Sequence, residues 1–464
     1  MKVRTEVEFQ EKFPRLRERM RWAGMPELAI AMLELYYRRL LAGEDGRIPE
    51  CEIEPVAELP DAEDLGKDYA AAGHRVMSQT VVIKLNGGLG TGMGLEKAKS
   101  LLVVKEDFTF LDLIARQAEA TGVPLLLMNS PATRSDSLAR LERYPGLRKA
   151  GLPLDFVQHR IPKLDPETLL PVSWPENPAL EWCPPGHGDL YPAFASSGIL
   201  TGLLEKGFRY AFVSNADNLG AGLDPAILGY FVEKKAPFMM EVADRTAADR
   251  KGGHLARRRS DGRLMLREAA QCPEGELEAF QDYQRYRYFN TNSLWLDLKA
   301  LETRLKDREQ PFELPLIVNR KPVDPRRSET PEVLQLETAM GAAIGVFPGA
   351  LAIRVPRSRF APVKTTDDLL AVRSDAYRLE DDFTVRLAAE AVPVIRLDPE
   401  FYRLVDNFEA HFPAGPPSLV ACRELTVEGD LIFGRDIAFK GCVRLVNRKP
   451  EAVKLADGLE ISGG

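Results

Sequence analysis

The sequence predicts an α/β protein with a smaller part at each end, and three features lead to that prediction. Between Thr80 and about Asp375, apolar and β-branched runs alternate with helical patterns, which is typical of a domain with a mostly parallel sheet. A glycine-rich stretch, Thr80–Ser100, begins with the first of these runs. Beyond residue 420, apolar residues recur every six positions, a period typical of a β-helix built from hexapeptide turns.

The alternating part is expected to contain strands separated by helices. The expected strands are Val81–Leu85, Leu101–Val104, Pro124–Met128, Leu154–Gln158, Tyr210–Ser214 and Phe238–Val242. The expected helices include Thr109–Thr121, Ser135–Arg143 and Ser196–Lys206. Ligands of such folds bind at the carboxyl ends of the strands. The glycine-rich loop, Asn129, Gln158 and Asn215–Asp217 all follow strands, so we expect them along one edge of the sheet.

The two ends of the chain differ from the middle. Residues 1 to about 42 have a helical pattern, with Pro26 opening its second half. Residues 43–68 are acidic and contain several prolines, as expected of a solvated connector. We therefore expect a helical N-terminal segment with its connector over residues 1–75, an α/β domain over 76–375 and a C-terminal domain over 376–464.

The six-residue period occupies two registers of the C-terminal part. The first register is Leu425, Leu431, Ile437 and Val443, and the second, two positions later, is Val427, Phe433, Phe439 and Leu445. An ordinary pair of strands is the alternative explanation. Few turns are present, so the pattern predicts a short β-helix.

Composition and charge exclude several classes of protein. The chain has 464 residues and a net charge of -7, which implies no general affinity for nucleic acid. Its five cysteines are scattered, which fits free thiols in a reducing compartment. The N-terminus has no secretory h-region and no run of about 18 apolar residues occurs. We expect a cytoplasmic protein without a membrane span.

The glycine-rich stretch has the composition of a phosphate-binding loop. Five of the eight residues Gly87–Gly94 are glycine, which lets the backbone approach a ligand closely and lets successive N–H groups form an anion site. Lys97 and Lys99 follow. The spacing matches neither the P-loop nor the dinucleotide fingerprint. A merely flexible loop is the alternative, but the preceding strand and the two lysines favour a polyphosphate site.

A metal site is expected at Asp217. This carboxylate follows the apolar run YAFVS and lies between Asn215 and Asn218. Mg2+ prefers oxygen ligands and often binds one or two carboxylates together with substrate phosphates. The alternative is a helix N-cap, but Asp224 could fill that role, so the metal site is favoured.

For two further residues, the sequence alone does not decide between a structural and a functional role. His187 lies between Gly186 and Gly188, and a single histidine is as often structural as functional. Lys364 follows a basic segment that would ordinarily be a solvated surface. The other histidines stand in no cluster, so the sequence supports neither a histidine-ligated metal nor a Ser-His-Asp triad. These histidines are His74, His159, His254 and His411.

The ordered motifs of the chain resemble those of one family. The stretch LNGGLGTGMG followed by Lys99-Ser100 is similar to the signature of the UTP–glucose-1-phosphate uridylyltransferase (UDP-glucose pyrophosphorylase) family, eukaryotic type. The similarity continues through LMNS (127–130), PPGHGD (184–189), VSNADNLG (213–220), KGG (251–253), FNTNSLW (289–295), QLETAMGAAI (335–344) and PRSRFAPVKTTDDLL (356–370). These blocks cover most of the chain in order.

The resemblance implies a fold and a reaction. The fold would be a Rossmann-like nucleotidyltransferase domain with a short left-handed C-terminal β-helix. The enzyme would transfer a uridylyl group from UTP to glucose 1-phosphate with Mg2+, reversibly giving UDP-glucose and pyrophosphate. The partners would be these small molecules, not nucleic acid or membrane, and a homo-oligomer is left open.

The resemblance also implies roles for individual residues. Lys99 and Lys364 would be catalytic, and Asp217 would bind the metal. The nucleotide would contact Leu85, Asn86, Gly87, Gly88, Lys99, Met128, Gln158, Gly186, Asn215 and Lys364. The sugar phosphate would contact His187, Gly253, Glu268 and Asn292. By this carry-over, Gln158 and the backbone at Gly186 read the uracil edge.

The chain departs from the family at one point. Where relatives usually read Lys-Gly-Pro-Lys-Ser, this chain has Glu96-Lys97-Ala98-Lys99-Ser100, so no role passes to the first lysine. A related UDP-sugar or UDP-N-acetylglucosamine pyrophosphorylase is an alternative, because the glycine loop is shared by such enzymes. A catalytically idle nucleotide-sugar sensor is another. Its expected sign, loss of Asp217 or the lysines, is absent from the sequence.

Overall fold

The computed structural model describes residues 2–148, 151–246, 249–307 and 309–463. They form two compact units, each built from three stretches of chain. Unit 1 comprises residues 1–83, 155–213 and 223–356, and unit 2 comprises residues 84–154, 214–222 and 357–464. The expected division at residues 75 and 375 stays a prediction.

A large central sheet organises unit 1. β9 (Tyr210–Asn215) lies beside β2 (Thr80–Asn86), and β13 (Tyr288–Asp297), β11 (His254–Arg258) and β1 (Ile53–Pro55) continue the sheet in that order. The alternation of strands and helices therefore predicts the mixed α/β class correctly. β13 runs antiparallel to β9 and β11, which the alternation does not predict.

Three more strands extend this sheet. β10 (Phe238–Asp244) pairs antiparallel with β13 and parallel with β16 (Leu351–Arg354). β12 (Leu264–Arg267) pairs antiparallel with β11. The register of β10 against β13 shifts between Glu241 and Val242, so the pair contains a bulge. Bulges often redirect side chains beside functional sites.

The N-terminal residues of unit 1 are helical where the structure describes them, as expected. α1 (Lys2–Trp22) packs on α2 (Glu27–Leu41), and the rings of Phe9 and Phe13 stack at 5.0 Å. The connector after α2 is more ordered than its acidic composition suggests. It contains β1, whose Ile53 is fully buried and whose backbone pairs with β11. The solvated connector predicted over residues 43–68 is mostly exposed or half-buried, but the prediction is wrong at β1, where Ile53 is buried.

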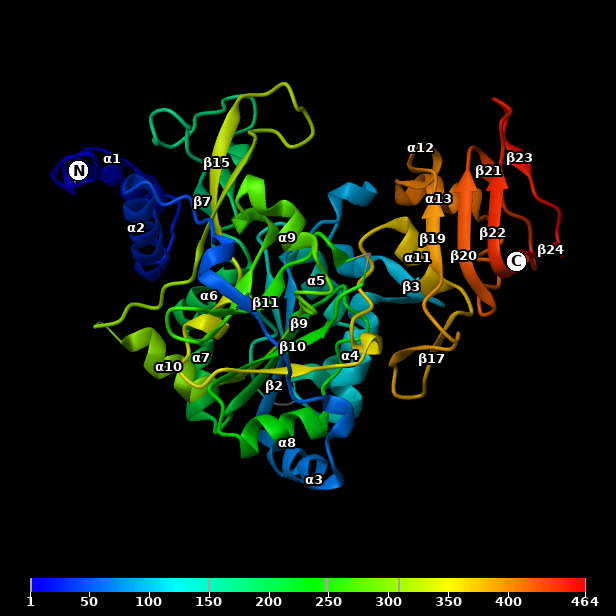
Figure 1. Cartoon of the computed structure of the whole chain (residues 1–464), viewed down its shortest axis with the longest axis horizontal. Helices are drawn as coiled ribbons and strands as arrows, with labels where there is room; N and C mark the ends of the chain where they lie inside the picture. The colour runs from blue at the N-terminus through cyan, green and yellow to red at the C-terminus, as the bar shows by residue number, and fades with distance from the viewer. Residues whose placement is uncertain (1, 149–150, 247–248, 308, 464) are drawn as a thin grey trace. The chain divides into compact units, whose positions relative to one another are not determined.

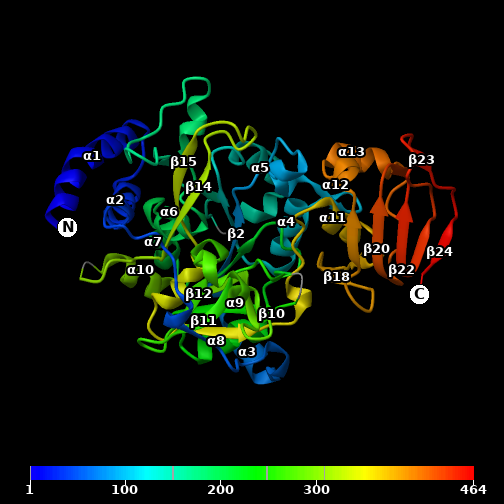
Figure 2. The same ribbon diagram turned by 45° about the horizontal axis from the view of Figure 1, so that its top comes forward.

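The other helices and strands of unit 1 surround the sheet (Figures 1 and 2). The helices are α3 (Lys67–Val76), α6 (Leu190–Ser196), α7 (Ile199–Glu205), α8 (Pro225–Glu233), α9 (Leu277–Gln281) and α10 (Leu298–Lys306). β6 (Asp155–Val157) is a further strand of the central sheet itself. The strands outside that sheet are β7 (Ile161–Pro162), β8 (Trp182–Cys183), β14 (Leu316–Pro322) and β15 (Glu332–Thr338). The single helix expected over Ser196–Lys206 is instead the end of α6 and all of α7, because Gly198 between them has φ of 76°.

Unit 2 begins with the last residues of β2 and continues through a short α/β segment. β5 (Leu125–Asn129), α4 (Phe110–Thr121) and α5 (Arg134–Leu141) lie close to their expected positions. α4 starts with a capping box, in which Thr109 and Asp112 each bond the other's backbone N–H. The strand expected over Leu101–Val104 is shorter and later, as β3 (Val103–Lys105), which pairs with β4 (Phe108–Thr109).

The C-terminal part of unit 2 contains a stack of parallel strands. β19 (Val394–Leu397), β20 (Cys422–Glu428), β22 (Ala438–Val446) and β24 (Glu460–Ser462) follow one another in one sheet. They are drawn in orange to red in Figures 1 and 2. A second parallel pair joins β21 (Leu431–Ile432) to β23 (Val453–Lys454). Before the stack and within it lie α11 (Thr366–Arg373), β17 (Tyr377–Leu379), β18 (Val385–Leu387), α12 (Pro399–Tyr402) and α13 (Val405–His411).

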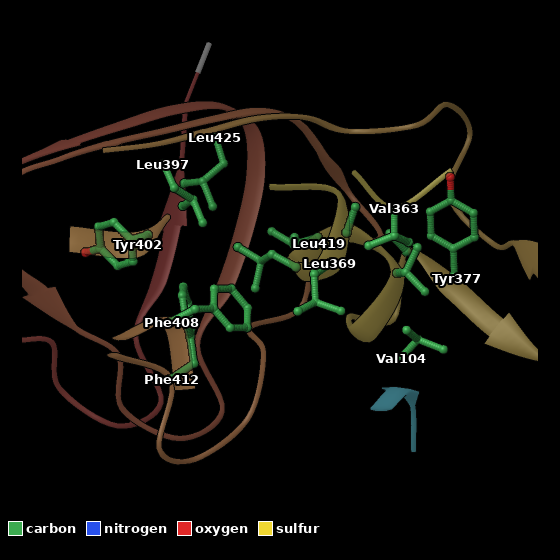
Figure 3. Close-up of a cluster of buried hydrophobic side chains, with 14 of the residues drawn as sticks. Val104, Val363, Leu369, Tyr377, Leu397, Tyr402, Phe408, Phe412, Leu419 and Leu425 are labelled. Carbon is green, nitrogen blue, oxygen red and sulfur yellow. The ribbon is translucent and has the colours of Figure 1, made fainter. Parts of the chain in front are cut away.

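One hydrophobic core joins this stack to α11. The first register of the six-residue period is buried, with Leu425 fully inaccessible and Val443 only 3% exposed. Figure 3 shows Leu425 and Leu419 in the same cluster as Leu369 of α11, Val363 and Val104. The segment that precedes α11 is therefore supported by side chains from the end of the chain.

Lys105 closes the carboxyl end of α11. Its ammonium is buried and donates to the carbonyl oxygens of Val372, Ser374 and Tyr377, at 3.2, 2.6 and 2.6 Å. A cation is favoured there, because the last carbonyls of a helix have no partner within the helix and carry partial negative charge. Burial nevertheless lowers the pKa of Lys105.

None of the helices in the described part of the chain is long and apolar enough to cross a lipid bilayer.

The parallel stack allows a matched test of the core. Val443→Ala should lower the free energy of unfolding by about 2 kcal/mol, because it removes two buried methyl groups and leaves a cavity. Val446→Ala changes the same side chain in the same strand, but Val446 is 44% exposed, so we expect about 0.5 kcal/mol or less. Urea denaturation measures both. Equal losses would contradict the assigned burial pattern.

Candidate active site

The glycine-rich loop leaves β2 at a well-anchored residue. Asn86 is buried, and its Nδ2 donates to Asn129 Oδ1 at 2.7 Å and to Ser137 Oγ at 2.8 Å. The loop then folds back on itself, since the Lys99 N–H donates to the Gly88 carbonyl at 3.0 Å. This bond fixes the start of the lysine segment against the first glycines.

Gly88 is one of two open glycines of the loop, together with Gly92. It is exposed, and a Cβ added to it would meet no atom within 4 Å. The space above its backbone is therefore available to a ligand, as the phosphate-site prediction requires.

Lys99 and Asp217 form an ion pair within unit 2. Lys99 Nζ lies 2.6 Å from Asp217 Oδ2, with the two side chains 14% and 24% exposed. The structure therefore brings together the predicted catalytic lysine and the predicted metal ligand. Asp224 caps α8 through bonds from the Ala226 and Ile227 N–H groups, so Asp217 is not needed as that cap.

The segment that carries Asp217 is bonded on both sides. On one side, the Ala216 N–H donates to the Leu85 carbonyl at 3.0 Å. On the other, the Val363 N–H donates to the Asp217 carbonyl at 3.1 Å, and the Ala361 N–H donates to Asn218 Oδ1 at 2.9 Å. The residue after Val363 is the exposed Lys364, so these bonds bring its backbone next to that of Asp217.

Lys84 is a site-supporting residue that the sequence reasoning missed. It is buried, and its ammonium donates to Ser214 Oγ at 2.7 Å and to the Ala221 carbonyl at 2.8 Å. These two partners lie near opposite ends of the segment with Asp217. A lysine inside the apolar run VVIKLN was the available signal, because a buried lysine requires polar partners.

The donor set around Asp217 suits a cation shared with a ligand. No group of three or more His, Cys, Asp or Glu side chains among the described residues could hold a metal ion. Asp217 offers a single carboxylate, and in this structure an ammonium lies against it. A site with one carboxylate fits Mg2+, which keeps several waters and takes its remaining ligands from substrate phosphates.

In unit 1, Gln158 and Gly186 are directly bonded. Gln158 Nε2 donates to the Gly186 carbonyl at 2.9 Å. Gly186 has φ of 77°, and a Cβ there would overlap the backbone of Thr338. Only glycine suits that position, and its carbonyl holds the Gln158 amide in one orientation.

His187 is held in one tautomer. The Met340 N–H donates to His187 Nδ1 at 2.9 Å, so Nδ1 is an acceptor and we assign the ring proton to Nε2. Burial lowers the pKa of His187. The ring is therefore neutral near pH 7 and offers one N–H donor.

His159 corrects a prediction from the sequence. The histidines outside PPGHGD were expected to stand in no cluster and to support no triad. His159 instead lies within bonding distance of one carboxylate and one hydroxyl group. Its Nδ1 lies 2.8 Å from Asp189 Oδ1 and its Nε2 lies 3.0 Å from Ser196 Oγ. These residues are separated in sequence, and the packing of α6 beside β6 brings them together.

Three of the predicted sugar ligands lie in or next to strands of unit 1: Gly253 just before β11, Glu268 just after β12 and Asn292 within β13. A Cβ on Gly253 would overlap the carboxylate of Glu268, so the two residues are adjacent. Asn292 has φ of 58°, an uncommon value for a non-glycine residue, and accepts a bond from Asn290 Nδ2 at 2.8 Å. It is one of the two extra residues of β13 at the point where the register with β10 shifts. Local strain of this kind is concentrated at ligand sites.

The remaining predicted nucleotide contacts lie in unit 2. Leu85 and Asn215 are partly exposed at the ends of β2 and β9, and Gly87 follows β2. Met128 is only 3% exposed inside β5, so little of its side chain can reach a ligand in this structure.

Comparisons with known proteins agree on one family. The family model described as UTP–glucose-1-phosphate uridylyltransferase matches residues 31–440. The enzyme of that name from Hordeum vulgare is 40% identical over 440 residues, covering 90% of this chain and 89% of the relative. The one from Saccharomyces cerevisiae is 40% identical over 392 residues, covering 82% and 77%.

A solved structure gives the same result. A point mutant of UDP-glucose pyrophosphorylase from Leishmania major, in complex with UDP-glucose, has a TM-score of 0.92 and 42% identity, with 98% of each chain covered. The match extends over both ends of this chain as well as its middle. The chain belongs to the UTP–glucose-1-phosphate uridylyltransferase family.

Proposed function

We propose that this protein transfers a uridylyl group from UTP to glucose 1-phosphate, releasing pyrophosphate and forming UDP-glucose. The observation that carries the proposal is the group formed by the open glycine loop, Lys99 and Asp217, in a chain 42% identical to an enzyme solved with UDP-glucose. The reaction exchanges one phosphoanhydride for another, so it should run in both directions.

The chemistry needs charge neutralisation more than a protein nucleophile. A phosphate oxygen of glucose 1-phosphate attacks the α-phosphorus of UTP, and pyrophosphate leaves. The enzyme's task is to align the two substrates and to offset negative charge that grows in the transition state. Lys99, Lys364 and the N–H groups of Gly87 and Gly88 supply positive charge and donors for that purpose.

We assign Mg2+ binding to Asp217. When bound, Mg2+ neutralises phosphate charge and acts as a Lewis acid. Lys99 pairs with Asp217 through Oδ2, and the other carboxylate oxygen would hold the cation. The triphosphate would supply further oxygens to both the cation and the Lys99 ammonium. Binding of nucleotide and of metal should therefore support each other.

We assign recognition of the base and the sugar to residues of unit 1. Gln158 Nε2 is bonded to Gly186, which leaves Oε1 to accept a hydrogen bond, and uracil N3–H is a suitable donor. The His187 Nε2–H is a donor for a phosphate oxygen of the sugar substrate. Gly253, Glu268 and Asn292, with nearby polar atoms, are assigned to the glucose hydroxyls.

We also propose that the C-terminal stack is a short hexapeptide-type β-helix, left-handed as in the related enzymes. Leu425 pairs with Val443, eighteen residues later, which corresponds to three hexapeptides per turn. The parallel pairs Leu431–Val453 and Phe439–Ile461 repeat the pattern with four extra residues. This regular parallel register favours a β-helix over an isolated pair of strands.

Release of pyrophosphate from UTP tests the function. Purified protein should release it with Mg2+ and glucose 1-phosphate, and more slowly with galactose 1-phosphate or N-acetylglucosamine 1-phosphate. Equal or faster turnover of N-acetylglucosamine 1-phosphate would favour the related pyrophosphorylase. Absence of turnover with every sugar, together with tight binding of UDP-glucose, would indicate a sensor.

The empty space beside Gly88 in the glycine-rich loop leads to a testable prediction. Gly88→Val should leave folding intact, because the new side chain enters empty space, but it should block the nucleotide and lower kcat/KM by about 100-fold or more. Gly202→Val in α7 is the control, since Gly202 also has open space at Cβ and no positive φ. Normal turnover of the Gly88 variant would remove this loop from the site.

Asp217 and Lys364 should differ in the kind of defect they cause. Asp217→Asn keeps the shape and removes the charge, so it should weaken Mn2+ binding in the presence of a non-reactive UTP analogue, measured by electron paramagnetic resonance. Lys364→Met should lower kcat by about 10²–10³ with little change in Mn2+ affinity. The exposed Lys206, which has no assigned role in the site, provides a control, Lys206→Met. Unchanged Mn2+ binding in Asp217→Asn would mean that the metal is held by other residues.

A further inference from the structure

We infer that the buried pair formed by Asp189 and His159 is a positioning device for uracil recognition. It joins the loop with Gln158 to the loop with Gly186 and His187. The inference rests on the proposed function, because it explains how the base-reading amide is held in place. Asp189 and His159 would act through Gln158 and would not touch the nucleotide.

The pair forms two bonds between the loops. Asp189 Oδ2 accepts the His159 backbone N–H at 2.7 Å, and Asp189 Oδ1 accepts from His159 Nδ1 at 2.8 Å. Both residues are buried, with 5% and 7% exposed. Burial raises the pKa of Asp189, and the bonds from His159 oppose that rise. Because each residue is adjacent to a loop that bears a proposed ligand contact, the pair fixes both loops at once.

The Gln158 amide depends on this arrangement. Gln158 immediately precedes His159, and its Nε2 donates to the carbonyl of Gly186, three residues before Asp189. A shift of either loop would break that bond and free the amide to rotate. An amide presenting Oε1 favours uracil, whose N3–H is a donor, whereas cytosine N3 is an acceptor. Loss of the pair should therefore reduce discrimination between UTP and CTP.

Ser196 completes a Ser-His-Asp arrangement, but its surroundings do not suit hydrolysis. A serine nucleophile needs nearby N–H groups to stabilise an oxyanion. The Ser197 and Gly198 N–H groups donate to Ala193 and Ala195 carbonyls, and the Ile199 N–H donates to Ser197 Oγ. The residues that follow Ser196 thus offer no free donor. Ser196 instead forms the hydrogen bond to Nε2 of the His159 ring, on the side away from Asp189.

The surroundings of the pair make its bonds hard to replace. A cavity of about 30 Å³ lies against Asp189 and His159, and its other walls are mainly apolar side chains. They include Leu33, Ile161, Phe312 and Leu336. Few groups could satisfy His159 if Asp189 were removed, and an unsatisfied buried polar group is costly.

Two substitutions of Asp189 separate positioning from charge. Asn has the same shape, can accept the His159 N–H through Oδ1 and can donate to Nδ1 through Nδ2 if the ring proton moves to Nε2. Asp189→Asn should therefore keep the UTP preference, measured as the ratio of kcat/KM for UTP to that for CTP, within about threefold of wild type. Asp189→Ala removes both bonds and should lower this ratio by about tenfold, as expected for one misplaced hydrogen bond, mainly through the KM for UTP.

A matched control and a second variant make the test decisive. Asp165 also accepts backbone N–H groups, from Glu167 and Thr168, so Asp165→Ala should leave the ratio unchanged. Where Asp189→Ala does not fold, His159→Ala replaces it, since it keeps the backbone bond to Asp189 and should lower the ratio by a smaller factor. An unchanged ratio in the folded variant, or an equal loss in Asp189→Asn, would overturn the inference.

The ring proton gives a readout independent of activity. The chain has five histidines, so ¹⁵N-histidine spectra should resolve individual tautomers. We expect His159 to carry its proton on Nδ1 in the wild type and on Nε2 in Asp189→Asn. The same tautomer in both proteins would contradict the bonding scheme. A wild-type protein that forms no UDP-glucose from UTP would overturn the proposed function instead, which keeps the two failures distinct.

Discussion

The hydrogen bonds of the segment Ser214–Gly222 hold together the charged groups of unit 2. The segment is bonded to Leu85 through Ala216, and to Val363 through Asp217. Its backbone is thus shared between the strand that enters the glycine loop and the residues just before Lys364. Without these bonds, a carboxylate and two lysines from three stretches of chain would have no common frame.

Two buried lysines show how the backbone around these charged groups is kept rigid. Lys84 is buried where a charge is costly, and its bonds to Ser214 and to the Ala221 carbonyl offset part of that cost. Elsewhere in unit 2, Lys105 bonds in a comparable way to the carbonyls at the end of α11. Both lysines lie away from the proposed reacting atoms. They stabilise the backbone on which the reacting charges depend, and this arrangement matches the general need for preorganised dipoles in catalysis.

The sequence predicted the parts of the fold that local pattern controls. β2, β5, β9 and β10 lie where apolar and β-branched runs indicated strands, and α4 begins at the cap that Thr109 and Asp112 provide. β13 was missed because polar residues interrupt its apolar pattern, and its stability comes from pairing with distant strands. β1 was missed because its three residues, Ile-Glu-Pro, have no strand pattern and lie inside an acidic segment. Only the pairing with β11 identifies it as a strand.

In the candidate site, too, the sequence predicted individual residues but not the contacts between distant loops. Lys99 and Asp217 were recognised from motifs, and the ion pair between them agrees with a common task. The bond between Gln158 and Gly186, and the pair formed by Asp189 and His159, depend on how loops meet in three dimensions. The spacing of residues along the chain does not predict such contacts between loops.

The extra residues in the C-terminal stack bear on how this part of the chain can change in evolution. The turn after β22 is four residues longer than the one before it, yet Phe439 and Ile461 still meet in register. The lengthened corner is closed by Asn447, whose Nδ2 donates to the carbonyls of Asp430 and Glu451. A corner of this kind absorbs insertions without disturbing the strands on either side. It is therefore where an epitope tag or a fluorescent label could be added with the least effect on the remainder of the protein.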